Sequence, residues 1–468
     1  MTQTSSSLCK SFFRYAMLNV LGMVGLSCYI LADTFFISKG LGANGLAALN
    51  LAIPVYSFIH GSGLMLGMGG ATRYSVLQGQ GSSHTHEAKL VFLHTLHMLV
   101  LFAALFVLLG IFCSEGITAL LGANEEIFSM TKTYLQVILL FSPAFLLNEV
   151  LICFVRNDGN PRLPMLGMLF GSLSNIVLDY IFIFPFHLGI LGAVLATGFA
   201  PLVSMAILSF HWFSKKNSAA LKLKHFFVQA TSAQALSSRL SLARQTISLG
   251  FPSLISEVAS GVVMIVFNFL ILSLQGNLGV AAYGVIANLS LVVNSIYTGI
   301  AQGMQPLASQ AYGQTMASEQ NMTSEQPELQ SQKTGRPNAL RQIFRYAITT
   351  TLLVSAVLYA GIFLFADPIT RVFNSEQNAT LQEIAVLGLK LYFTSIPFTG
   401  FNILLTTFFI STMKALPAQI ISLLRGLLLV IPLAFLLSAL ADLNGVWLTL
   451  PLTEAIVALL GIGLMRRK

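Results

Sequence analysis

Charged residues are scarce in this chain of 468 residues. Asp, Glu, Lys and Arg make up only 9% of it, whereas hydrophobic residues make up 55%. A water-soluble domain carries about 25% charged residues, so this composition excludes a soluble globular protein. The same scarcity leaves no basic soluble domain large enough to hold nucleic acid, although the net charge is +8. The sequence therefore predicts an integral membrane protein.

Cysteine is also rare, and its four residues are far apart: Cys9, Cys28, Cys113 and Cys153. This spacing fits neither a disulfide framework nor a zinc site. The chain has no HExxH motif, and the histidine pair His94 and His97 lies near the start of a hydrophobic run, where a surface position is favoured. No segment resembles a repeated channel filter. We therefore expect neither an enzyme, nor a bound cofactor, nor a channel.

Long hydrophobic runs fill most of the chain. At about 20 apolar residues per membrane-spanning helix, they predict about twelve spans. A β-barrel would show short alternating segments, but these runs are continuous. The first run carries Asp33 and lacks a small-residue cleavage site, so we expect a retained helix rather than a signal peptide. The expected spans are 14–38, 46–72, 90–113, 131–155, 163–186, 189–212, 246–273, 280–312, 342–365, 385–411, 417–440 and 444–465.

A polar, basic stretch divides the chain into two hydrophobic halves. We expect an N-lobe over 1–212, a cytoplasmic linker over 213–245 and a C-lobe over 246–468, with six helices in each lobe. A second hydrophilic stretch, 314–340, is rich in Gln, Ser and Glu, which predicts a cytoplasmic loop. The fold class is thus an all-α integral membrane protein with two six-helix lobes.

The two halves resemble each other. Pro143 and Asn148 recur as Pro397 and Asn402, both at an offset of 254 residues. Equal spacing of unusual residues indicates an internal repeat. Six spans restore the direction of the chain, so the two lobes should be related by an axis along the membrane normal, as in many secondary transporters.

Lys and Arg are unevenly distributed between the ends of the predicted spans. With a cytoplasmic N-terminus, only four of the 25 fall on the outer side: Lys39, Lys132, Arg371 and Lys390. The others lie inside or at the inner rim, which is a strong positive-inside bias. We expect a multi-pass protein of the plasma (inner) membrane with both termini in the cytoplasm.

Four polar residues lie inside hydrophobic runs at matching depths. A carboxylate at bilayer depth costs about 2.5–3.5 kcal/mol on insertion scales, so Asp33 and Asp179 are candidates for function. Asn175 shares one helix face with Asp179, and these residues and Thr197 all lie roughly 9–12 Å below one membrane face. Two carboxylates in one pocket cannot easily both stay ionised, so the pair can bind a proton or hold Na⁺. The alternative is that these residues only hydrogen-bond neighbouring helices.

Five motifs stand out along the chain: Asp33–Phe35, Arg156–Pro161, Asn175–Asp179, Gly192–Thr197 and Gln302–Leu307. As a set they resemble the multidrug and toxic compound extrusion (MATE) family, in its prokaryotic branch with an acidic pair in the N-lobe. The resemblance covers nearly the whole chain and implies a twelve-helix, two-lobe fold that exports cationic or amphipathic compounds, driven by inward Na⁺ or H⁺. It also implies that Asp33, Asn175, Asp179 and Thr197 form the N-lobe cation or proton site.

We therefore predict a secondary active multidrug antiporter that works by alternating access, with H⁺ or Na⁺ as its coupling ion. Its partners would be small organic cations and membrane lipid, without nucleic acid, and we expect a monomer. The alternative is a flippase for a lipid or lipid-linked oligosaccharide. A flippase should need a wide basic cavity, whereas the basic residues here follow the inner rim.

Further candidates lie outside the acidic pair. Glu257 and Glu454 fall near mid-membrane and are candidates for a second protonation or substrate site. Met and aromatic side chains repack easily and attract cations, so seven of them are candidates for the substrate cavity. These are Tyr29, Phe35, Tyr56, Met65, Met68, Tyr283 and Met304.

Overall fold

The computed structural model describes residues 5–213, 234–322, 339–374 and 377–466, and the regular structure in these ranges is helical throughout. Within them, nine helices or bent helix pairs are long and apolar enough to cross a membrane. Three of the nine are each two helices joined at a sharp break, at Gly42, Gly276 and Ala441–Asp442. The predictions of an all-α fold and about twelve spans are therefore confirmed.

The first half of the chain forms seven α-helices. They are α1 (Ser5–Gln80), α2 (Thr85–Phe112), α3 (Ser114–Leu120), α4 (Glu125–Leu140), α5 (Ser142–Asn157), α6 (Arg162–Ile183) and α7 (Gly189–Phe213). α1 reverses at Gly42, whose positive φ of 65° favours glycine. Pro143 stands in the first turn of α5, and α4 and α5 form one span that is bent by 49°.

The second half repeats this pattern of bends. It contains α8 (Gln234–Met322), α9 (Ala339–Phe373), α10 (Ala379–Tyr392), α11 (Ile396–Ser411), α12 (Ala415–Leu423), a π-helical turn (Leu424–Leu428) and α13 (Val430–Arg466). α8 reverses at Gly276 with φ 61°, as α1 does at Gly42. Pro397 opens α11 as Pro143 opens α5. The repeat predicted from the sequence therefore has a counterpart in the backbone.

One helix, α8, extends into both of the hydrophilic stretches that the sequence predicted as linker and loop. α8 already begins at Gln234, inside the predicted linker, and continues to Met322, inside the predicted loop. The segment 314–322 lacks Gly and Pro and contains several good helix formers, which explains the extension. Residues 214–233 and 323–338 lie outside the described residues.

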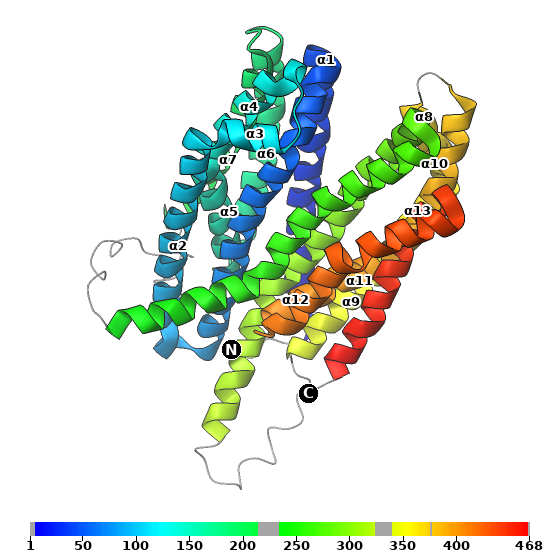
Figure 1. Ribbon diagram of the computed structural model, residues 1–468. Coiled ribbons are helices and arrows are strands. Elements are labelled where there is room, and N and C mark those ends of the chain that lie inside the picture. The colour runs from blue at the N-terminus through cyan, green and yellow to red at the C-terminus, as the bar shows by residue number, and fades with distance from the viewer. Residues whose placement is uncertain (1–4, 214–233, 323–338, 375–376, 467–468) are drawn as a thin grey trace.

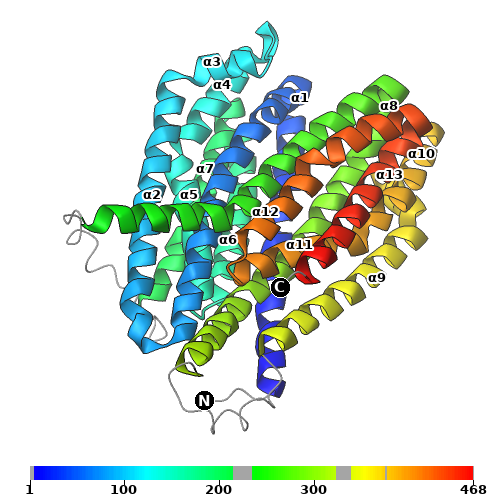
Figure 2. The same cartoon turned by 60° about the horizontal axis from the view of Figure 1, so that its bottom comes forward.

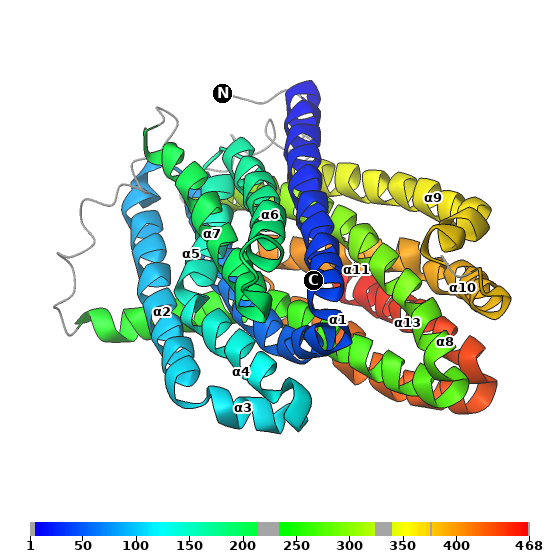
Figure 3. The ribbon, with the colours of Figure 1, turned by 90° about the horizontal axis from the view of Figure 1, so that it is seen from above.

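Two hydrophobic clusters form the cores of the two lobes. The first joins buried side chains between residues 37 and 194, and the second joins those between 267 and 447 together with three from the start of α1. Figures 1 and 3 accordingly place α2–α7 on one side of the molecule and α9–α11 with α13 on the other. Both chain termini lie at the same end of the bundle, called the terminal end below (Figure 1).

Each lobe also receives the start of a long helix from the other half of the chain. Leu8, Phe12 and Ala16 of α1 belong to the C-lobe cluster. Leu242 and Ile247 of α8 pack against the N-lobe cluster, and Figure 2 shows the start of α8 running toward α2. α1 and α8 therefore form most of the contact between the lobes.

Candidate functional site

The four predicted polar residues of the N-lobe come together between three helices. Asp33 lies on the first half of α1, Asn175 and Asp179 on α6, and Thr197 on α7. Their exposed fractions are 7%, 0%, 0% and 5% in that order. α6 and α7 approach closely because Gly167 faces Ser204 without a side chain between them. The depth argument from sequence thus identified a real cluster.

Hydrogen bonds connect Asn175 to Asp179 and to Thr197, and Asp33 lies beside this group. The Asp33 and Asp179 carboxyl groups are close enough to interact electrostatically. With its amide oriented to suit its neighbours, Asn175 donates to Asp179 Oδ2 at 3.1 Å and accepts from the Thr197 backbone N–H at 3.2 Å. The Thr197 hydroxyl donates to the Ala193 carbonyl at 3.1 Å.

One oxygen of each carboxyl group has no donor. Asp33 Oδ1 and Asp179 Oδ1 are both buried, and no hydrogen-bonding partner from the described part of the chain reaches them. A buried carboxylate oxygen without a donor is costly. A proton or a small cation would satisfy it, and the amide and hydroxyl oxygens nearby are suitable further ligands for a hard cation.

Sequence reasoning missed Tyr134 on α4. This tyrosine is 3% exposed and lies close enough to Asp33, Asp179 and Thr197 to interact with them. Tyr29, which was predicted only as a cavity residue, is close enough to interact electrostatically with both aspartates. The sequence did contain a signal for Tyr134, since it is a tyrosine within a hydrophobic span and a buried tyrosine hydroxyl usually needs a polar partner.

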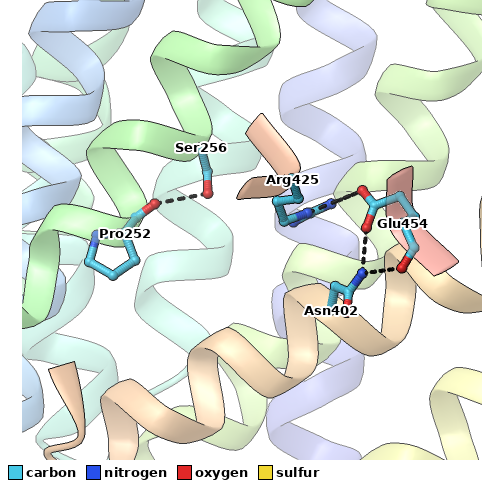
Figure 4. Close-up of polar contacts among 5 residues, drawn as sticks. All are labelled: Pro252, Ser256, Asn402, Arg425 and Glu454. Atoms are coloured by element: carbon cyan, nitrogen blue, oxygen red, sulfur yellow. Dashed lines mark hydrogen bonds and ion pairs between the residues drawn. The ribbon is translucent and has the colours of Figure 1, made fainter. Parts of the chain in front are cut away.

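The C-lobe holds a different arrangement, an internal ion pair. Arg425, on the π-helical turn, donates to Glu454 Oε1 from Nε at 3.1 Å and from Nη2 at 2.7 Å. Asn402 donates to Glu454 Oε2 at 2.6 Å, and Figure 4 shows both partners directed at the glutamate. Glu454 is 2% exposed. These contacts favour a structural role for Glu454, and its predicted part in protonation or substrate binding stays a prediction.

Glu257 lies at the contact between the lobes. Its Oε2 is 3.6 Å from His60 Nδ1, and on the other side His60 Nε2 is 3.4 Å from Glu149 Oε1. The sequence predicted Glu257 as a candidate but gave no signal for His60. This is because the three residues belong to α1, α5 and α8, which are distant in sequence.

The seven predicted cavity residues do not gather in one place. Tyr29 and Tyr56 meet through their hydroxyl groups at 3.1 Å, beside His60. Met65 and Met68 are buried farther along α1, and Phe35 is exposed at 56%. Tyr283 and Met304 are packed inside the C-lobe cluster. A shared substrate cavity for this set stays a prediction.

At the terminal end, amide side chains and one arginine join the lobes. Arg156 Nη1 donates to Asn19 Oδ1 at 2.9 Å and to Gln302 Oε1 at 2.6 Å. Asn157 donates to Gln305 Oε1 at 2.9 Å. Arg156 is fully buried, and no carboxylate in the described ranges pairs with it. These contacts hold this end closed.

Backbone contact adds to this closure. Gly69 of α1 faces the Thr246 carbonyl of α8, and Gly250 of α8 faces the Met65 carbonyl of α1. A Cβ atom at either glycine would overlap the opposite backbone, so only glycine allows this approach.

Comparison with known proteins agrees with this geometry. The family model MatE matches residues 20–181 and 331–436, more than half of the chain. The chain belongs to the MatE family. As a member of this transporter family with apolar helices suited to crossing a membrane, it is a multi-pass membrane protein, and the resemblance found in its sequence is confirmed.

Relatives of this MatE protein match along almost their whole length. The multidrug export protein MepA of Staphylococcus saprophyticus is 27% identical over 454 residues, which cover 97% of this chain and 92% of the relative. MepA of Staphylococcus aureus is 25% identical with the same coverage.

Solved structures of MATE transporters share the fold. A MATE protein in complex with MaL6 has a TM-score of 0.84 at 22% identity, covering 99% of this chain and 98% of that one. The outward-facing conformation of a multidrug resistance MATE family transporter has a TM-score of 0.82 at 23% identity, covering 100% and 98%. The twelve-helix, two-lobe architecture predicted from sequence is therefore confirmed.

Proposed function

We propose that this protein exports cationic and amphipathic small molecules across the plasma membrane in exchange for H⁺ or Na⁺. The coupling ion binds at Asp33 and Asp179, with Asn175 and Thr197 as supporting ligands. The observation that carries this proposal is the pair of buried carboxyl groups, each with one oxygen that receives no hydrogen bond from the described residues. Export of drugs by the MepA relatives supports the substrate class.

The proposed cycle uses the two lobes as the moving parts. The drug enters between the lobes from the cytoplasmic side, and the lobes then rock to open outward. H⁺ or Na⁺ binds at Asp33 and Asp179 from outside, which changes the packing of the first half of α1 and expels the drug. The ion-loaded protein returns inward. The positive-inside distribution of Lys and Arg supports a cytoplasmic terminal end.

Closure of the terminal end fits the half of the proposed cycle in which the protein is closed to the cytoplasm. Arg156 and Gln302 join the lobes there, so their hydrogen bond has to break before the drug enters from the cytoplasm. We therefore take this conformation to be closed to the cytoplasm, and we expect a monomer to complete the cycle.

Efflux from proteoliposomes tests the proposal. A fluorescent organic cation is loaded, and Na⁺ and pH gradients are imposed separately. One gradient should drive efflux in the wild type, and Asp33→Asn and Asp179→Asn should each lose that response while the protein stays folded.

The matched control is Asp367→Asn, which makes the same change at an exposed carboxylate that pairs with Arg371 at 2.8 Å. It should leave efflux unchanged. Full gradient-driven efflux in Asp33→Asn would refute the site assignment. Absence of flux under either gradient in the wild type would shift the weight to lipid-like substrates.

A further inference from the structure

His60 lies between two glutamates that come from different lobes. On the N-lobe side, Glu149 of α5 approaches Nε2 to 3.4 Å, and on the C-lobe side Glu257 of α8 approaches Nδ1 to 3.6 Å. Both ring nitrogens thus face carboxylate oxygens. Neutral imidazole has only one N–H, so this arrangement suits the doubly protonated, positively charged ring. His60 is the only basic side chain paired with either glutamate in the described part of the chain.

Charge in this cluster is not balanced. With both carboxylates ionised, one imidazolium leaves a net charge of minus one inside the membrane-spanning part of the molecule. Arg425 and Glu454 of the C-lobe, in contrast, balance each other one to one. Acidic groups within spans are expensive to keep, and an uncompensated one favours a role in binding a cation.

An aromatic ring stacks on the imidazole and is itself packed against further aromatic residues. Tyr56 stacks on His60 with ring centres 5.9 Å apart and planes inclined by 27°, and the Tyr56 ring meets the edge of Phe145. The Tyr56 hydroxyl is 3.1 Å from that of Tyr29. Carboxylates and aromatic faces together are the usual means of holding an organic cation. The imidazolium of His60 therefore has the surroundings that a bound organic cation would need.

Two glycines set the spacing of the cluster. Gly61 lies against Glu257, and Gly63 lies against Glu149; a Cβ atom at either glycine would come within 3.1 Å of the opposite glutamate Cβ. The helix turn that carries His60 therefore fits closely between α5 and α8. The cluster is still partly accessible, because the Glu257 side chain is 35% exposed.

We propose that Glu149 and Glu257 form a binding site for the cationic group of the transported compound, and that His60 is an internal cation that competes for it. The site takes monovalent organic cations with flat aromatic substituents. This rests on the proposed export function and identifies the substrate contact within it. Because the two carboxylates belong to different lobes, rocking separates them and lowers the affinity for the cation, as alternating access requires.

Because His60 competes with the ligand, replacing a glutamate and replacing His60 should change the affinity for the cation in opposite directions. Glu149→Gln and Glu257→Gln each remove one charge that attracts the ligand, so each should weaken cation binding about tenfold. His60→Gln removes the internal competitor and keeps a polar side chain, so it should strengthen binding by about the same factor. A purely structural role would not produce opposite signs.

The test is equilibrium binding of radiolabelled tetraphenylphosphonium to purified protein in lipid nanodiscs without any ion gradient. This probe is a permanent monovalent cation with four flat rings and no titratable group. Glu115→Gln is the matched control, because Glu115 is 70% exposed and pairs with the exposed Lys132. It should bind as the wild type does. Unchanged melting temperature and elution volume verify folding, and His60→Gln decides the matter if a glutamate variant does not fold.

Three results would overturn the inference. They are absence of saturable binding to the wild type, wild-type affinity in both glutamate variants, and a His60→Gln protein that binds no more tightly than the wild type. The binding assay uses no gradient, so it is independent of coupling at Asp33. If efflux does not respond to an ion gradient but the variants still change tetraphenylphosphonium binding in opposite directions, only the proposal of ion coupling at Asp33 and Asp179 is refuted.

Discussion

Replacing Glu454 by Gln should strongly destabilise the C-lobe. Glu454 is 2% exposed and receives two hydrogen bonds from Arg425, at 2.7 and 3.1 Å, and one from Asn402 at 2.6 Å. Glu454→Gln leaves the guanidinium, which is only 15% exposed, without its counter-charge. Removing one partner of a buried ion pair costs about 3–5 kcal/mol. The free energy of unfolding should fall by that amount.

Unfolding in mixed micelles, followed by tryptophan fluorescence, measures this change. The variants are made in a Trp212→Phe protein, so that the signal comes from Trp447, which is fully buried in the C-lobe cluster. Glu115→Gln is the control, since it removes an exposed pair with Lys132 at 2.6 Å, and exposed pairs contribute little.

A double variant separates the unpaired charge from lost packing. Arg425→Met combined with Glu454→Gln removes both charges, so it should cost less than Glu454→Gln alone. Equal costs for Glu454→Gln and Glu115→Gln, or a double variant whose cost equals the sum of the single costs, would refute this reasoning.

Two further predictions concern the closed terminal end. Gly250→Ala places a methyl group against the backbone of α1, so it should slow efflux and lower the melting temperature. Gly261→Ala is the control on the same helix, because a Cβ atom there meets nothing within 4 Å, and it should leave both quantities near wild type. Equal effects of the two substitutions would show that close packing at Gly250 has no special role. Arg156→Met removes the donor to Gln302, so buried Cys153 should react with a maleimide about tenfold faster in a protein without other cysteines. An unchanged labelling rate would show that this hydrogen bond does not hold the end closed.

Much of the fold was predictable because hydrophobic runs report directly on spans. The breaks were predictable as well, since Gly42, Gly276 and Ala441–Asp442 each fall between two predicted spans. The ends of the helices were harder to predict, because helices such as α8 continue past the hydrophobic run into polar sequence.

The acidic pair of the N-lobe was predictable from depth alone. Asp33 and Asp179 lie at similar distances from the ends of their predicted spans, and this one coordinate was enough to predict that they come together. The cluster at His60 was not predictable in this way. Glu149 and Glu257 meet it from helices whose rotation about their own axes depends on packing across the lobes, and hydropathy carries no information on that rotation.

Reciprocal flux shows whether a drug is exchanged for an ion at Asp33 and Asp179. Proteoliposomes at equal pH and equal Na⁺ receive only a gradient of a fluorescent organic cation, while indicators inside report H⁺ and Na⁺. We expect the drug gradient to drive one of the two ions in the opposite direction in the wild type, and Asp33→Asn to abolish this ion movement. Drug movement without any opposite flux of H⁺ or Na⁺ in the wild type would rule out exchange.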